Sequence, residues 1–136
     1  MIQRIQTLWL LLASACAFLS MKFPFFYIGA NQNVNSDQFN ATTNMILLIL
    51  TSILATLCLF TIFVFKQRKL QLWLTILAII ISCLNIFLYF NDKKNYAGGG
   101  LALTSVFAFV IPLFLIFAAR GIYKDQKLIR SMDRLR

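Results

Sequence analysis

Residues 45–90 decide the fold, and they read MILLILTSILATLCLFTIFVF (45–65), KQRK (66–69) and LQLWLTILAIIISCLNIFLYF (70–90). Neither apolar run contains Asp, Glu, Lys or Arg. At about 1.5 Å per residue each run forms a helix of about 31 Å, which matches the thickness of the hydrocarbon core of a bilayer. Because KQRK is too short for anything but a tight turn, the stretch predicts two antiparallel transmembrane helices.

Two further apolar stretches flank this hairpin. The first leads into the aromatic segment KFPFFYIG (22–29), and the last follows the turn-like segment NDKKNYAGGG (91–100). The polar segment 29–44 suits a solvated loop. The 136 residues are therefore predicted to form a single integral membrane domain (1–136), an all-α bundle of four transmembrane helices with spans at about 5–21, 45–65, 70–90 and 101–119.

The composition supports a protein built for lipid. Hydrophobic residues make up 60% of the chain and charged residues only 12%, and the mean hydropathy is +0.79. The net charge of +9 could suggest a nucleic-acid partner. However, the basic residues flank the apolar runs, where membrane topology places them, so no nucleic-acid partner is expected.

The distribution of Lys and Arg predicts the orientation. Ten of the thirteen lie at one end of the predicted bundle, namely at position 4, in KQRK and in the tail 120–136. The other three are Lys22, Lys93 and Lys94. Since basic residues accumulate on the cytoplasmic side, both termini are predicted to be cytoplasmic, and four spans agree with that parity.

The segment LLASAC (11–16) also resembles the end of a cleaved signal peptide, with Cys16 as a candidate lipidated residue. The apolar run nevertheless continues past this cysteine, whereas a cleaved signal normally gives way to polar sequence. We therefore expect the first stretch to act as a membrane anchor.

The predicted spans hold few groups that could do chemistry. The chain has no His and no Glu, and Asn85 is the only side-chain amide deep within a span. A proton relay needs an intramembrane carboxylate or His, and a hydrolase needs a nucleophile with a base. Three scattered cysteines are too few for a metal site. We expect neither catalysis nor a metal or other cofactor.

Depth matching suggests a partner for Asn85. The third span rises from the cytoplasmic side and the fourth descends, which places Thr104 and Ser105 at a similar depth. Pro112 frees the carbonyl of Ala108, because proline has no N–H. We predict that Asn85 hydrogen-bonds to Thr104, Ser105 or that carbonyl, contributing about 0.6–2 kcal/mol. The alternative is that these groups line a substrate path.

Each span carries two small residues four positions apart, a pattern that lets membrane helices approach closely. The pairs are Ala13/Ala17, Thr51/Ala55, Ala78/Ser82 and Thr104/Ala108.

The tail RGIYKDQKLIRSMDRLR (120–136) is predicted to form a short basic amphipathic helix in the cytoplasm. Its apolar positions recur at helical spacing, and much of the rest of its surface carries basic residues, namely Lys124, Lys127, Arg130, Arg134 and Arg136. One interpretation is a topology signal that lies on anionic lipid headgroups. The other is a docking helix for a protein partner or for the chain's own N-terminus.

The N-terminus MIQRIQTLWLLLA (1–13) is more polar than a plain anchor requires. Gln3, Arg4 and Gln6 are predicted to lie on the same side of the membrane as the tail. Our hypothesis is that one of these three hydrogen-bonds to Asp125, Asp133 or the tail backbone and so holds the two ends together.

These two end segments also resemble a family of small Bacteroidota membrane proteins, known as domain of unknown function 4293. The resemblance covers the whole chain, and in the tail the matching residues are Lys124, Asp125, Arg130, Ser131, Asp133, Arg134, Leu135 and Arg136. Trp9 departs from the family, which often has Tyr in the opening segment. The resemblance implies the inner membrane of a Gram-negative bacterium, and it implies no activity, substrate or catalytic residue.

Together these features favour a non-catalytic accessory or scaffolding subunit of a larger inner-membrane assembly, with a membrane protein as its partner. The alternative is a small transporter, channel or lipid-binding protein. A polar path lined by Asn85, Ser82 and Thr104 would favour the alternative.

Overall fold

A computed structural model describes residues 3–27, 38–39, 41–42, 44–65, 67–95 and 100–133. The described chain contains four long helices, and the last of them is preceded by a short 3-10 turn, η1 (Leu103–Ser105). Each of the four is long and apolar enough to cross a membrane, as expected for a multi-pass membrane protein. The long helices are α1 (Gln3–Lys22), α2 (Met45–Phe63), α3 (Arg68–Asn95) and α4 (Val106–Asp133).

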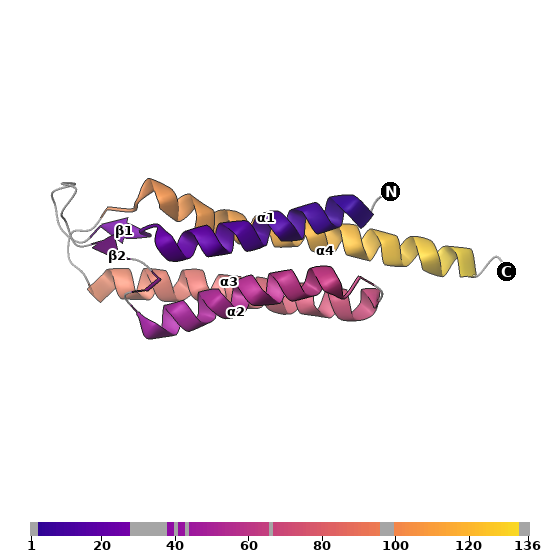
Figure 1. The fold of residues 1–136 in the computed structure, drawn as a ribbon, viewed down its shortest axis with the longest axis horizontal. Helices are drawn as coiled ribbons and strands as arrows, with labels where there is room; N and C mark the ends of the chain where they lie inside the picture. The colour runs from indigo at the N-terminus through magenta and orange to yellow at the C-terminus, as the bar shows by residue number, and fades with distance from the viewer. Residues whose placement is uncertain are drawn as a thin grey trace.

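The helices form an up-and-down bundle in which α1 and α3 each pack against α2 and α4 (Figure 1). The start of α1, the α2–α3 turn and the end of α4 lie at one end of the bundle, which we name the terminal end. The strands β1 (Phe26–Tyr27) and β2 (Gln38–Phe39) lie at the opposite end, which we name the ladder end.

Small residues fill the middle of the bundle. Of the four predicted small pairs, every member except Thr104 is buried. Larger side chains such as Leu54 and Leu115 complete this core. The outer surface is apolar as well, and Phe87, for example, is 70% exposed. Small residues inside and large apolar residues outside are the arrangement expected when the helices are surrounded by lipid.

The ladder end is closed by three segments that are distant in sequence. β1 pairs antiparallel with β2, so that Phe26 lies opposite Phe39, and Leu101 forms a bridge with Phe26. The backbone N–H of Phe25 donates to the Phe39 carbonyl at 2.9 Å, and that of Ala102 donates to the Phe25 carbonyl at 3.0 Å. Residues 25–27 therefore form the middle of a small three-segment ladder.

Aromatic rings fill the space beneath this ladder. Phe25 stacks on Tyr89 of α3 with ring centroids 4.2 Å apart, and Phe26 stacks on Phe39 at 4.4 Å. All four rings are buried. Side-chain hydrogen bonds support the same end, since Asn44 donates to Asp92 of α3 and Thr104 donates to the Pro24 carbonyl.

α4 differs from the prediction of a fourth span followed by a separate tail helix. It begins only after residues 101–102, which pair with the ladder, and it continues without interruption to Asp133. At about 1.5 Å per residue its 28 residues reach about 42 Å, which exceeds the hydrocarbon thickness. Residues 120–133 are therefore the last turns of α4, and its end extends past α1 at the terminal end (Figure 1).

Candidate functional site

A hydrogen bond between buried side chains joins the first and last helices at the terminal end. Gln6 of α1 donates from Nε2 to Oδ2 of Asp125 of α4 at 2.5 Å. Both residues are 6% exposed. The pair is one of those that the sequence hypothesis allowed, and we name it the clasp. A hydrogen bond to a buried carboxylate is stronger than one between neutral groups, so the clasp favours a fixed alignment of α1 and α4.

Gly121 makes the close approach at the clasp possible. A Cβ atom added to Gly121 would lie only 2.8 Å from Cγ of Gln6. Gly121 lies one turn before Asp125 on α4, so it faces the same helix. Leu10 on α1 and Ile122 on α4 are buried at this end. Glycine at this position therefore lets Gln6 pass between the helices and reach the carboxylate.

Among the other predicted interaction residues, Lys124 is the one whose side chain the structure describes. Lys124 is exposed. The side chains of Gln3, Arg4, Arg130 and Asp133, together with all of Arg134 and Arg136, lie outside the part of the chain that the structure describes.

A second buried amide joins α2 to α3 at the same end. Gln71 donates from Nε2 to the Thr61 carbonyl at 3.3 Å, and Thr75 donates to the Gln71 carbonyl at 2.7 Å. Sequence reasoning did not single out Gln71. The available signal was a glutamine at the second position of a predicted span, a place that Gln6 also occupies.

The predicted hydrogen bond between Asn85 and Thr104, Ser105 or the Ala108 carbonyl is absent from the described structure. Asn85 is 5% exposed, and its Oδ1 is buried without a hydrogen-bond partner among the described residues. Thr104 donates instead to the Pro24 carbonyl, because the 3-10 turn at the start of the fourth helix lies beside the ladder. The Pro24 carbonyl is therefore an acceptor that competes with Asn85 for the Thr104 hydroxyl.

Four serines of the spans donate within their own helices, namely Ser14, Ser20, Ser52 and Ser82. Ser14 donates to the Leu11 carbonyl and Ser82 to the Ile79 carbonyl, both at 2.8 Å. Such bonds satisfy a hydroxyl in a membrane helix without a partner on another helix. Within the described residues, no group of three or more His, Cys, Asp or Glu gathers in one place.

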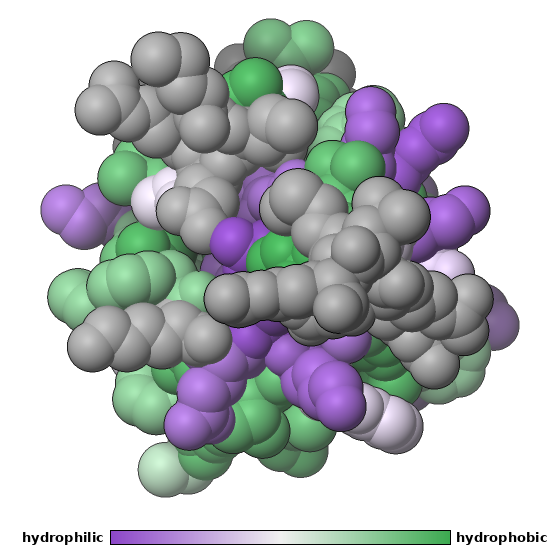
Figure 2. Space-filling model, turned by 90° about the vertical axis from the view of Figure 1, so that its right-hand side faces the viewer, coloured by the Kyte–Doolittle hydropathy of each residue, from purple (hydrophilic) through white to green (hydrophobic). Residues whose placement is uncertain are grey.

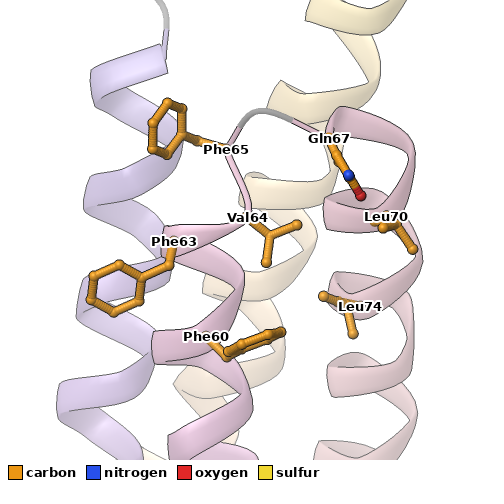
Figure 3. A pocket seen from close by; sticks show the side chains of 7 residues that line it. All are labelled: Phe60, Phe63, Val64, Phe65, Gln67, Leu70 and Leu74. Atoms are coloured by element: carbon orange, nitrogen blue, oxygen red, sulfur yellow. The ribbon is translucent and has the colours of Figure 1, made fainter.

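An open apolar groove lies between α2 and α3 at the terminal end of the bundle (Figure 3). Its volume is about 720 Å³. In Figure 3 Phe60 and Val64 point from the end of α2 toward α3, where Leu70 and Leu74 lie. We name this hollow the hairpin groove, and its lining residues are Phe60, Phe63, Val64, Phe65, Gln67, Leu70 and Leu74.

A second hollow, of about 520 Å³, lies between the start of α3 and the end of α4. It shares Gln67 and Leu70 with the hairpin groove, and its other lining residues are Arg68, Lys69, Gln126 and Ile129. We name it the basic rim. Figure 2 looks onto the terminal end and shows hydrophilic side chains around its edge, with hydrophobic ones between them. Apolar and cationic surfaces are therefore adjacent here.

No curated protein and no solved structure matches this chain. The model of one family, Domain of unknown function (DUF4293), matches residues 2–135. This match covers both end segments as well as the four helices between them, so the chain belongs to the DUF4293 family.

Proposed function

We propose that this protein is a non-catalytic accessory or scaffolding subunit of an inner-membrane assembly, with both termini in the cytoplasm. The observation that supports the proposal is the exposed end of α4. Lys124, Lys127, Leu128 and Ser131 recur at helical spacing and are all exposed. We name these four residues the docking face.

The docking face is separated from the packing face of the same helix. Ile122 and Asp125 are buried toward the bundle, and Asp125 is held by the clasp. A helix that is fixed by its inner side and extends past its neighbours can present its outer side to another protein without unfolding. Its exposed leucine among lysines suits a partner surface that combines apolar and acidic groups.

Cysteine labelling tests the orientation. In a chain with Cys16, Cys58 and Cys83 replaced by alanine, Lys93→Cys at the ladder end is expected to react with a membrane-impermeant maleimide in spheroplasts with sealed membranes. Ser131→Cys at the terminal end is expected to react only after the membrane is opened, because ten of the thirteen basic residues favour the cytoplasm at that end. The opposite labelling pattern would invert the proposed topology.

The partner role is tested by disrupting the docking face. The double variant Lys124→Glu with Leu128→Ser is expected to lower the recovery of a stoichiometric partner at least about tenfold, because loss of an interface hot spot has an effect of this size. The partner is purified with the protein in mild detergent and quantified by mass spectrometry. A photo-crosslinking residue at position 128 should capture the same protein in intact cells.

The matched control is Lys94→Glu with Leu103→Ser, which makes the same chemical changes at exposed positions of the ladder end. Recovery that is unchanged in the docking-face variant, or that falls equally in both variants, would refute this role for α4.

A further inference from the structure

The hairpin groove and the basic rim meet along α3 and form one continuous surface. Both contain Leu70 and Gln67. Moving from the helical spans toward the chain termini, this surface changes from Phe60 and Leu74 to Arg68 and Lys69. The order is that of a phospholipid in a bilayer, whose hydrocarbon chains are followed by a charged headgroup.

The charges at the terminal end favour an anionic ligand. Arg68 and Lys69 form no ion pair with a described residue. The described cationic side chains of α4 here are Arg120, Lys124 and Lys127, and its described carboxylate, Asp125, is buried and accepts a hydrogen bond from Gln6. No described carboxylate is therefore available to neutralise the basic rim.

The dimensions also suit a lipid. The volume of about 720 Å³ for the hairpin groove lies within the range of about 300–1,000 Å³ typical of small-molecule sites. Among the described residues its lining is almost entirely apolar, and the one polar side chain there, Gln67, lies where the groove meets the basic rim. A soluble anion such as free phosphate would use the rim and leave the groove without a role.

We propose that the two hollows together bind one anionic phospholipid from the leaflet at the terminal end. An acyl chain lies along Phe60 and Leu74, and the phosphate lies against Arg68 and Lys69. Basic pockets between transmembrane helices are known to bind anionic headgroups in this manner. The residues of α4 that line the site, Gln126 and Ile129, do not belong to the docking face.

Native mass spectrometry of the full chain tests the proposal through titration with phosphatidylglycerol and, separately, phosphatidylethanolamine. Phosphatidylglycerol is expected to bind about thirtyfold more tightly, since each of the two basic residues near the headgroup contributes about 1 kcal/mol. Arg68→Gln with Lys69→Gln is expected to reduce its affinity to that of phosphatidylethanolamine. Lys93→Gln with Lys94→Gln neutralises two adjacent lysines at the other end of the same helix and should leave the preference intact.

The apolar half of the site has its own matched pair. Phe60 is 60% exposed within the hairpin groove, whereas Phe87 is 70% exposed on α3 outside it. Phe60→Ala is expected to lower the affinity for both lipids severalfold, because it removes part of the apolar lining. Phe87→Ala is expected to change neither affinity. Equal affinity of the unchanged protein for the two lipids would overturn the proposal. Equal losses of phosphatidylglycerol affinity in the Arg68/Lys69 and Lys93/Lys94 double variants would do so as well. So would displacement of the lipid by millimolar inorganic phosphate, or a dimer of the chain without bound lipid.

Discussion

The substitution Phe26→Ala is expected to lower the free energy of unfolding by about 3–5 kcal/mol, the usual cost of removing a buried aromatic ring. Phe26 is fully buried, and it belongs to the middle segment of the ladder between Phe39 and Leu101. Its loss removes the stacking with Phe39 and leaves a cavity beneath the ladder. Denaturation by SDS in mixed micelles, followed by tryptophan fluorescence, would measure the change.

Phe23→Ala is the control for this prediction. Phe23 is only three positions away, but it is 43% exposed, so its removal should change the stability by less than about 1 kcal/mol. In addition, Phe26→Ala and Phe39→Ala should be non-additive, because the two rings are in contact. Similar losses in Phe26→Ala and Phe23→Ala would show that the ladder does not hold the bundle closed.

The ladder shows the limit of sequence reasoning for this protein. The four helices follow from apolar length alone, because a bilayer sets a nearly fixed requirement for a spanning helix. Phe25 and Phe26 follow Pro24 at the end of a span, a composition that predicts rings at the membrane interface, whereas both rings are buried. Whether these rings are buried depends on the pairing of their segment with residues 38–39 and 101. Local sequence carries no signal for partners that are so distant.

The polar contacts were predictable in part, and the clasp and Asn85 show why. For the clasp, the shared side of the membrane reduced the possible partners of Gln6 to a few groups on the tail, and Asp125 was among them. For Asn85, depth identified Thr104, but a backbone acceptor at Pro24 lies closer to that hydroxyl. Side chains can be matched by depth from sequence, whereas competition from loop carbonyls becomes visible only in the fold. The hairpin groove had no sequence signal, since it depends on where two neighbouring helices end.

The second large effect is expected for Gly121→Val, which should lower the free energy of unfolding by up to about 2.5 kcal/mol. A Cβ at this position would lie 2.8 Å from Cγ of Gln6, whose amide is held by Asp125. The valine must therefore separate α1 from α4 or displace Gln6 and leave a buried carboxylate without its donor, and either change costs about 1–3 kcal/mol. The gain in helix propensity over glycine, about 0.5 kcal/mol, is too small to offset this cost.

Trp9 provides the measurement, because its ring packs against Phe114 and Phe117 of α4 at 5.4 and 5.3 Å. In a Trp73→Phe background its fluorescence should report the separation of α1 from α4 at a lower SDS fraction in the Gly121→Val variant. Gly100→Val is the control, since nothing lies within 4 Å of a Cβ at that position. Adding Gln6→Ala to Gly121→Val removes the clashing atoms, so the double variant should lose less stability than the sum of the two single losses. Strict additivity would mean that the valine acts elsewhere, and the clasp would then not be what aligns the first helix with the last.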